Sequence, residues 1–552
     1  MIDVLFITRL YRRENIESDV YKDFRLIVDG QVATLDHLRN IVPTPVSREV
    51  TNQVRSEKNN PNTPVLTPIY INEYLKKHGI TMVEIPSLED DFKKVSTYLK
   101  DGVRVIALST TWLTAMNGAV HIRKAAKLLK SISPHTPLLI GGMNIAKGLQ
   151  VRKLINEKKL TGIFPKWVEE NGYFSRLCFG LLKKILARHF LLLDGRADAL
   201  IDGIVVNETG EVTLRDIVNS IKSGNDIYVI PNLAIPEGND YHFTESQEVD
   251  IDLDSQIVDW TNYVSSLNEH EAPVRRGTGC PYKCAFCDFQ DLQKIRIRSM
   301  ESVISELKTL TEAGHKKVYF VDDDIAFSKK NLYDFTRAII AAKLNITWSS
   351  FLRADTIDSE TASLLKESGC KEIRLGVESG DPQVLKNMNK GTDPEQVLNA
   401  IHYLDSAGVI SQNSFVVGFP GECDRSLDNT ASFISSLPSG DNARAFHRYA
   451  LFPFMLSPLS PVASPEMREK FNLKGVAGNW SHSTMNSKEA NKAVRELFLR
   501  IKGPSHMYTE NLPDEWENSK IRKVIELRDA LQKERLRGNI NISLDELMKA
   551  VK

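Results

Sequence analysis

Three of the six cysteines in this 552-residue chain lie within eight residues, at Cys280, Cys284 and Cys287. The segment that begins at Gly277 spaces them C-x3-C-x2-C and follows an apolar-basic run, residues 272–276, that can form a strand. Cysteine thiolates are the usual protein ligands of iron–sulfur clusters. Because a cubane cluster has four irons, three thiolates leave one iron open to a small molecule, as at catalytic metal sites. The motif therefore predicts a [4Fe-4S] cluster in a loop after a strand.

A zinc site is the alternative for these thiols. Zinc sites favour four ligands in C-x2-C pairs, and the chain has no second pair of this kind. Asp288 and His315 are only weak candidates for a fourth ligand. The other cysteines, Cys178, Cys370 and Cys423, are scattered and are expected to be ordinary buried thiols, although Cys423 follows a predicted site strand.

The length and composition indicate two or three globular domains. Lys plus Arg equals Asp plus Glu, at 71 each, so charge gives no reason to expect nucleic acid or an anionic membrane as a partner. The sequence shows no signal-peptide core and no apolar run long enough to span a membrane. Few cysteines, clustered in one loop, suit a reducing compartment. We therefore expect a cytoplasmic protein.

The first part of the chain alternates short apolar strands with amphipathic helices, which predicts a parallel sheet covered on both faces. We expect a Rossmann-like domain over residues 1–230, interrupted by an insertion, residues 164–193, that is either a helical cover or a lid. The expected strands are residues 2–8, 81–85, 103–109, 137–142 and 201–206, and the expected helices are residues 68–78, 88–99, 118–131 and 209–222.

Ligands of such sheets bind beyond the carboxyl ends of the strands. Three of these ends are small, polar or glycine-rich, which lets a large ligand approach backbone amides and helix N-termini. They are either ordinary turns or a cofactor site, and the repetition over three ends favours the site. The candidate residues are Ser109, Thr110, Gly141, Gly142, Asn144, Glu208 and Gly210.

A polar, proline-punctuated stretch, residues 231–267, is expected to link this domain to a second one, residues 268–455. There six predicted strands alternate with helices, which is typical of a partial (β/α)6 barrel with its chemistry at the C-terminal strand ends. Residues 456–552 are expected to form a mostly helical cap that helps to bind the substrate. Within that cap, Trp480 and His482 are either packing residues or part of a substrate cavity.

The strand ends of the second domain are polar in a consistent way. Acidic side chains can accept hydrogen bonds from ribose hydroxyls or an ammonium group, an arginine can hold a carboxylate, and glycines admit a ligand close to the backbone. His447, Arg448 and Tyr449 on the sixth strand are further candidates for substrate contact. The candidate cofactor-binding residues are Asp322, Asp324, Arg353, Glu378, Ser379 and Gly418.

Taken together, these motifs resemble the radical S-adenosylmethionine (SAM) superfamily. The three cysteines match its cluster motif, and the resemblance implies that Phe286 lies near the adenine of SAM. The segments at residues 376–380 and 417–422 also match its core. Residues 64–225 resemble the cobalamin-binding domain of one class of these enzymes. The Asp-x-His-x-x-Gly signature is absent, which is normal for this class, so no histidine is assigned to cobalt.

The resemblance implies a cobalamin-dependent radical SAM methyltransferase that acts on an unactivated carbon of a small molecule through a 5′-deoxyadenosyl radical and methylcobalamin. It also implies an electron donor such as flavodoxin or ferredoxin. Two alternatives keep the radical chemistry: a rearrangement, cyclisation or transfer of another SAM-derived group, or an N-terminal domain that is only a scaffold. A third is a non-catalytic, redox-sensing iron–sulfur protein. The sequence does not identify the substrate.

Overall fold

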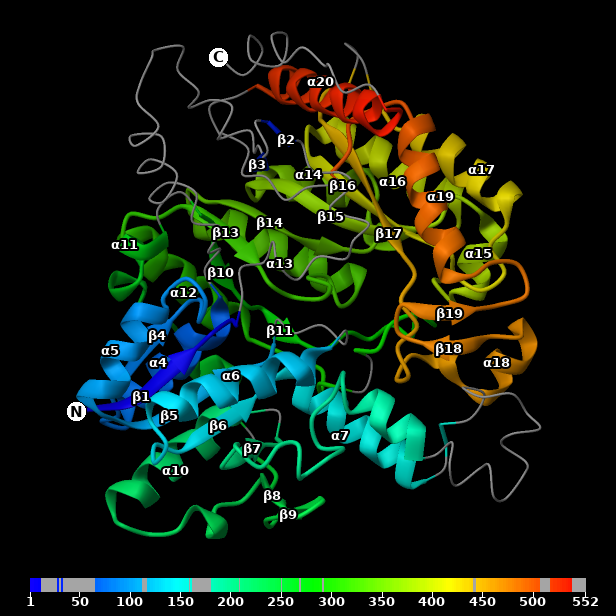
Figure 1. Cartoon of the computed structure of the whole chain (residues 1–552). Coiled ribbons are helices and arrows are strands. Elements are labelled where there is room, and N and C mark those ends of the chain that lie inside the picture. Colours follow the sequence, from blue (N-terminus) through cyan, green and yellow to red (C-terminus); the bar gives the residue numbers. More distant parts are fainter. Residues whose placement is uncertain are drawn as a thin grey trace.

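Two sheets organise the protein (Figure 1). The computed structural model describes residues 1–10, 27–28, 31–32, 65–111, 117–157, 159–160, 180–207, 209–249, 251–267, 270–289, 292–439, 443–506 and 517–538. The first sheet holds strands from the N-terminal half, and the second holds strands between residues 272 and 453. Both are built from parallel strands separated by helices, which confirms the expected α/β class.

The first sheet has seven strands in the order β4-β1-β5-β6-β7-β8-β9, of which the first five run parallel. Its inner strand β1 is buried on both faces, from Val4 at 0% to Phe6 at 4% exposure, as strands covered by helices on both sides require. The strands are β1 (Ile2–Ile7), β4 (Met82–Ile85), β5 (Val103–Ser109), β6 (Leu138–Gly141) and β7 (Gly203–Val205). The helices are α4 (Leu66–Lys77), α5 (Phe92–Asp101), α6 (Gly118–Ile132), α7 (Met143–Asn156) and α10 (Gly210–Lys222).

Part of the expected linker belongs to this sheet. Strands β8 (Leu233–Glu237) and β9 (Asp240–Phe243) form an antiparallel hairpin that pairs with β7. Leu233, Ala234 and Ile235 are at most 4% exposed, so this edge is a packed one. The prediction missed it because the apolar run is only three residues long and ends at Pro236. Further along, Trp260 is fully buried and packs edge-on against Tyr263.

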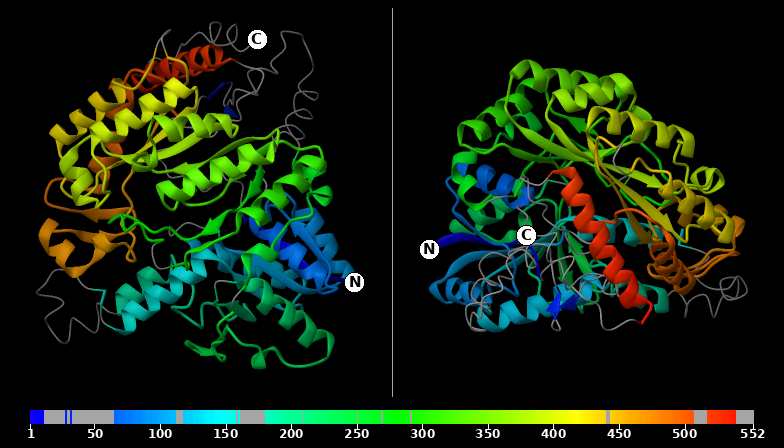
Figure 2. Two further views of the ribbon diagram at one scale, coloured as in Figure 1. Left: turned by 180° about the vertical axis from the view of Figure 1, so that it is seen from behind. Right: turned by 90° about the horizontal axis from the view of Figure 1, so that it is seen from above.

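The second sheet has six parallel strands in sequence order and does not close. Helices lie on one side of it (Figure 2). The strands are β10 (Ala272–Val274), β13 (Lys317–Phe320), β14 (Thr347–Leu352), β15 (Cys370–Glu378), β16 (Ile410–Val417) and β17 (His447–Pro453). The helices are α11 (Val264–Leu267), α12 (Met300–Glu312), α13 (Lys329–Ala342), α14 (Ser359–Glu367), α15 (Pro382–Asn387), α16 (Pro394–Ala407) and α17 (Asp424–Ser435).

The C-terminal part is mostly helical, as expected, but it also contains a hairpin. Strands β18 (Lys474–Val476) and β19 (Asn479–Ser481) pair antiparallel beside the short helix α18 (Pro465–Phe471). Helix α19 (Ser487–Arg500) begins with a capping box between Asn486 and Glu489. Helix α20 (Asn518–Leu536) follows it along the outside of the molecule. Two further short pairs are β2 (Ile27–Val28) with β3 (Gln31–Val32), and β11 (Gly277–Thr278) with β12 (Arg296–Ile297).

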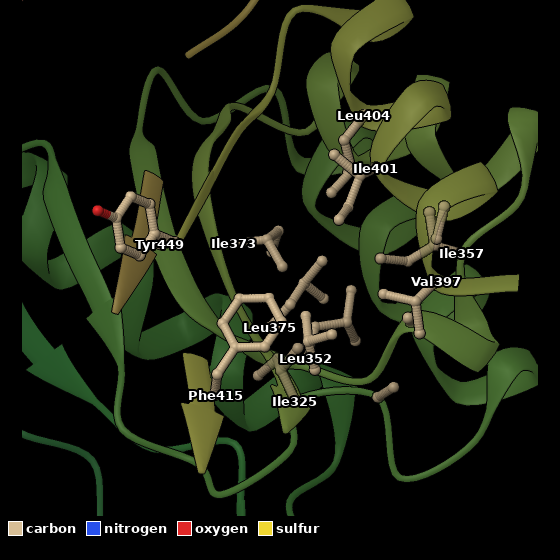
Figure 3. Close-up of a cluster of buried hydrophobic side chains, with 14 of the residues drawn as sticks. Ile325, Leu352, Ile357, Ile373, Leu375, Val397, Ile401, Leu404, Phe415 and Tyr449 are labelled. Atoms are coloured by element: carbon tan, nitrogen blue, oxygen red, sulfur yellow. The ribbon is translucent and has the colours of Figure 1, made fainter. Parts of the chain in front are cut away.

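The main hydrophobic core lies between the second sheet and its helices. Figure 3 shows Leu352, Ile373 and Leu375 directed toward Val397, Ile401 and Leu404 of α16. Leu66, Ile69 and Tyr70 of α4 are part of the same core, so the first unit is packed firmly against the second. None of the helices in the described parts of the chain is long and apolar enough to cross a lipid bilayer.

Candidate active site

The cysteine loop lies at the carboxyl end of β10 and is held by backbone hydrogen bonds from distant parts of the chain. The Ala285 amide donates to the Met388 carbonyl at 2.7 Å, and the Val462 amide donates to the Ala285 carbonyl at 2.9 Å. The Asn389 side-chain amide donates to the Lys283 carbonyl at 2.7 Å. The loop is therefore fixed by the segment after α15 and by the C-terminal part.

The three thiols suit a cluster better than a single ion. Cys284 is buried, and Cys280 and Cys287 are partly exposed. In the described parts of the chain, no three His, Cys, Asp or Glu side chains converge closely enough for one metal ion. A cubane binds each thiolate to a different iron, so its ligands surround it rather than converge. Burial raises the pKa of the Cys287 thiol to about 12, and a bound metal would deprotonate it outright.

Arg353 links the thiols to the end of β14. Its Nη1 lies 3.8 Å from Cys284 Sγ, and its guanidinium lies 3.8 Å from the centre of the Tyr282 ring. Nη2 donates to Asp355 at 2.8 Å and to the Lys390 carbonyl at 2.6 Å. This buried cation is therefore already fixed beside the cluster loop.

Two of the predicted aspartates have different roles. Both carboxylate oxygens of Asp322 accept backbone amides, from Arg276 at 3.0 Å and from Gly277 at 2.5 Å. Asp322 thus holds the start of the cysteine loop. Asp324 is 1% exposed, and its Oδ2 has no hydrogen-bond partner among the described residues. Burial raises the pKa of Asp324 to about 6. Burial also raises the pKa of the Cys280 thiol, and the nearby charge of Asp324 adds to that rise.

The end of β15 adds a charged pair. Glu378 accepts a hydrogen bond from Lys390 Nζ at 2.9 Å, and both side chains are at least 90% buried. Lys390 Nζ lies 5.8 Å from the centre of the Phe286 ring. Glu378 has a backbone φ of +71°, a strained conformation of the kind that gathers at functional sites. Lys390 thus lies between Glu378 and Phe286 of the cysteine loop.

Ser379 and Gly418 make contacts with other residues of the protein. The Ser379 hydroxyl lies 3.2 Å from that of Thr430. A Cβ on Gly418 would lie 2.5 Å from the Ala490 Cβ, and the Gly418 carbonyl accepts His482 Nε2 at 3.1 Å. The glycine is therefore required by packing against the C-terminal part, where Trp480 stacks on His482.

At the first sheet, the predicted strand ends mostly bond to one another. The Thr110 hydroxyl donates to the Gly141 carbonyl at 2.8 Å, and the Ser109 hydroxyl donates to Thr111 at 3.2 Å. Asn144 donates to the His189 carbonyl at 3.0 Å, while its buried Oδ1 has no partner among the described residues. Glu208 lies outside the described residues, as do Trp112 and Cys178.

A cavity of about 340 Å³ lies at the end of β7. The strand side contributes Val206, Asn207 and Thr209, next to Gly210 at the start of α10. Lys294 and Arg296 of the second unit close the other side, so both units line the cavity. The Thr209 hydroxyl is buried and has no partner among the described residues. Lys294 and Arg296 belong to no sequence motif, so local patterns do not predict this basic pair.

An ion pair joins the two predicted cofactor regions. Helix α7 begins at Met143, directly after the glycines that end β6. One turn further, Lys147 Nζ lies 2.8 Å from Asp288, which follows Cys287, and 4.7 Å from the centre of the Phe289 ring. Helix α7, which begins at the carboxyl end of β6, therefore contacts the cysteine loop.

Other expectations have mixed outcomes. His447 and Tyr449 are at most 3% exposed, and His447 Nδ1 is 2.8 Å from the Ser411 hydroxyl, so both are packing residues. Arg448 is also buried and bonds to His506, a contact between distant segments that no local pattern predicts.

Cys370 is buried as expected, whereas Cys423 is exposed because it caps the first turn of α17 at the surface.

Sequence comparison finds a family match over most of the second unit. Residues 274–434 match the Radical SAM superfamily. A protein of Pyrococcus horikoshii named as an uncharacterized methyltransferase is 28% identical over 246 residues, which cover 43% of this chain and 53% of that protein. The anaerobic magnesium-protoporphyrin IX monomethyl ester cyclase of Rubrivivax gelatinosus is 26% identical over 379 residues, covering 67% and 61%. The chain thus spans roughly half the length of the first of these curated relatives.

Structure comparison extends the likeness to nearly the whole chain. The cobalamin-dependent SAM radical enzyme OxsB, solved with aqua-cobalamin and SAM, aligns over 97% of this chain and 72% of its own, with a TM-score of 0.58 and 14% identity. The radical SAM methyltransferase TsrM of Kitasatospora setae, solved with tryptophan and a SAM analogue, aligns over 85% and 76%, with a TM-score of 0.53 and 15% identity. At such identities the likeness concerns the fold. The chain therefore carries a radical SAM domain within the fold of the cobalamin-dependent radical SAM enzymes.

Proposed function

We propose that the protein is a cobalamin-dependent radical SAM enzyme that transfers a methyl group to an unactivated carbon of a small molecule. One observation carries the proposal: α7 begins at the glycine-rich end of β6 and pairs through Lys147 with Asp288, next to Cys287. The region proposed for the corrinoid and the cluster loop are thus in direct contact. Methyl transfer is also in the names of the Pyrococcus relative and of TsrM.

Cys280, Cys284 and Cys287 would hold the cluster, and the open iron would bind SAM. When bound, these groups supply hydrogen abstraction by a radical, and cobalamin supplies the methyl group. Among the chain's own residues, the unpartnered Oδ2 of Asp324 can accept a hydrogen bond from an ammonium or hydroxyl group. Arg353, which is held by Tyr282 and Asp355, keeps positive charge beside the thiolates.

The residues at the first sheet fit a corrinoid cofactor. Asn144 and Thr209 each have a buried oxygen without a partner among the described residues, which a ligand would satisfy. A cavity of about 340 Å³ lies beside Thr209, and its basic lining residues are Lys294, which pairs with Glu248 of the same lining, and Arg296, whose guanidinium suits a phosphate. We propose that it receives only the phosphate-bearing part of the cofactor, because its volume is that of a small ligand.

A second candidate keeps both cofactors but not methylation. The Rubrivivax relative, which matches 67% of the chain, is a cyclase. Both candidates act on a small molecule and need an electron donor of the flavodoxin or ferredoxin type. The redox-sensing alternative would not consume SAM.

An anaerobic assay separates these functions. The full chain is reconstituted with iron, sulfide and hydroxocobalamin, then given SAM and a strong reductant, and both 5′-deoxyadenosine and S-adenosylhomocysteine are measured. We expect both products, formed by turnover without substrate, and expect Cys284→Ala to abolish 5′-deoxyadenosine. Deoxyadenosine without S-adenosylhomocysteine would favour the second candidate. Neither product from a protein that holds its cluster and cobalamin would refute the radical enzyme.

A further inference from the structure

Lys390 is a buried lysine in the turn that follows α15. It is 7% exposed, whereas Asn389 and Gly391 on either side of it are exposed. Both neighbours have left-handed backbone conformations, with φ of +51° and +74°, so the turn is tight around the lysine. Burial of a lysine costs free energy unless its ammonium group is paired. The partner of Lys390 therefore indicates what the lysine does.

That partner is Glu378, at the end of β15. Lys390 Nζ donates a hydrogen bond to Glu378 Oε1 at 2.9 Å. The pair lies directly over Gly376, because a Cβ at that position would be 2.4 Å from Oε1 and 3.0 Å from Nζ. Residue 376 must therefore lack a side chain for the ammonium and carboxylate groups to meet.

Glu378 is held in an unusual conformation and is only half satisfied. The residue is 8% exposed, yet Lys390 is the one hydrogen-bond partner of its carboxylate among the described residues, and that bond uses only Oε1. The register of β15 against β16 shifts between Gly376 and Glu378, where the backbone φ is +71°. Bulges and strained residues of this kind re-aim side chains beside active sites. Buried acceptors are normally satisfied, so Oε2 is suited to a ligand.

The turn that carries Lys390 is bonded to the surroundings of the thiols through its backbone. The Met388 carbonyl accepts the Ala285 amide at 2.7 Å, and the Lys390 carbonyl accepts Arg353 Nη2 at 2.6 Å. The Lys390 ammonium group lies 5.8 Å from the centre of the Phe286 ring. The main chain of Lys390 is therefore fixed beside the cysteine loop, and its side chain links that loop to the end of β15.

We propose that Lys390 is a positioning residue for SAM. Its ammonium group holds Glu378 by Oε1 and balances the charge of the carboxylate, so that Oε2 accepts a hydrogen bond from the SAM bound at the open iron. Lys390 acts through Glu378 and does not contact SAM itself. The inference rests on the function proposed above and adds a residue to its SAM site.

The contacts of Lys390 distinguish this role from support of the cysteine loop. Main-chain atoms join the turn to Ala285 and Arg353, and a change of the Lys390 side chain leaves them in place. Loss of the ammonium group instead leaves the Glu378 carboxylate buried without its counter-charge, which no longer holds it in one orientation. Lys390→Met should therefore spare the cluster and weaken the binding of SAM.

Equilibrium dialysis of SAM against the anaerobically reconstituted full chain tests the proposal. We expect Lys390→Met to retain its iron and visible absorbance and to bind SAM at least about tenfold more weakly, since a hydrogen bond to a charged group is lost. The change that SAM causes in the electron paramagnetic resonance spectrum of the reduced cluster should need correspondingly more SAM. Lys390→Arg keeps the cation and should restore most of the affinity. Lys130→Met is the matched control, because Lys130 is 12% exposed and pairs with Asp202 at 2.6 Å, and it should bind SAM normally.

Two further variants test the pair itself. Gly376→Ala keeps both charges but places a Cβ where the pair lies, so SAM affinity should fall as in Lys390→Met while iron is retained; it also serves if Lys390→Met fails to fold. Glu378→Gln weakens the same contact with SAM. Adding Lys390→Met to it should lower the affinity by less than about twofold further, because residues that act through one contact are not additive.

Three outcomes would overturn the proposal while the proposed enzyme stands: unchanged SAM affinity in Lys390→Met, loss of iron from both Lys390→Met and Gly376→Ala, or losses of affinity that multiply in the double variant. The second would make Lys390 a support of the cysteine loop, and the third would place it directly on SAM. An unmodified protein that holds its cluster but binds no SAM would refute the proposed enzyme together with this inference.

Discussion

The two sets of strand ends, those of the first and of the second sheet, differ in how their polar groups are satisfied. At the second sheet, Arg353 and Asp324 lie around the cysteine loop, and Asp324 keeps a buried oxygen without a partner among the described residues. At the first sheet, Ser109 and Thr110 bond to neighbouring turns, and the buried oxygens without a partner among the described residues belong instead to Asn144 and Thr209. The difference teaches that polar composition alone does not identify a site. What distinguishes one is unsatisfied buried polarity beside a group that carries chemistry.

The largest effect is expected where the comparison is sharpest, at the cysteines. Cys287→Ser should remove the cluster, because one of the three thiolates that bind it is lost. Iron content and visible absorbance of the anaerobically reconstituted protein measure the effect. Cys423→Ser is the control, because this thiol is exposed and distant in sequence from the loop, and it should keep its iron. Equal iron in both variants would break the assignment of the loop.

A smaller effect is expected at the aspartates. Asp324→Asn removes the charge of the buried carboxylate whose oxygen lacks a partner, so the affinity for SAM should fall about tenfold. Asp323→Asn changes the adjacent side chain, which is exposed, and should have little effect. Equilibrium dialysis of SAM against both reconstituted variants measures the difference. Equal affinities would remove Asp324 from the site.

The sequence predicted these two regions unequally. The six strands of the second sheet and the cluster motif follow from local patterns, because alternation and cysteine spacing are short-range signals. Hydrogen bonding is not such a signal. Asp322 and Asp324 look equivalent in sequence, yet one is used by the amides of Arg276 and Gly277 and the other is not.

Long-range contacts explain the remaining misses. The ion pair between Lys147 and Asp288 joins residues 141 positions apart, and the hairpin of β8 and β9 depends on an edge that only the folded sheet provides. On the second sheet, Phe351, Arg374, Gln412 and Arg448 become neighbours through strand register, which no single segment of the sequence specifies.

At the first sheet, Gly142 provides a test of its strand end. Its φ of +108° and ψ of −167° belong to a region that is essentially restricted to glycine, and an added Cβ would lie 3.1 Å from the Thr110 amide nitrogen. Gly142→Ala should therefore cost about 1–3 kcal/mol of stability and reduce cobalamin retention. Gly224→Ala, at φ +73° in open space, isolates the backbone cost and should keep the cobalamin. Chemical denaturation and cobalt content measure both, and full retention by Gly142→Ala would contradict a corrinoid at this strand end.

The smallest and most specific effect is expected at Lys147. Lys147→Gln removes the charge from one partner of an ion pair between two largely buried side chains, but its amide can still donate a hydrogen bond to Asp288, so stability should fall by about 1 kcal/mol. If α7 positions the corrinoid relative to the cluster loop, methyl transfer should depend on the Lys147–Asp288 pair more than SAM cleavage does. S-adenosylhomocysteine should then fall while 5′-deoxyadenosine stays nearly constant. Lys492→Gln, in an exposed helical pair with Glu496, should change neither product. An equal fall of both products in Lys147→Gln would mean that Lys147 only supports the cysteine loop, and the two sets of strand ends would then have to be regarded as independent.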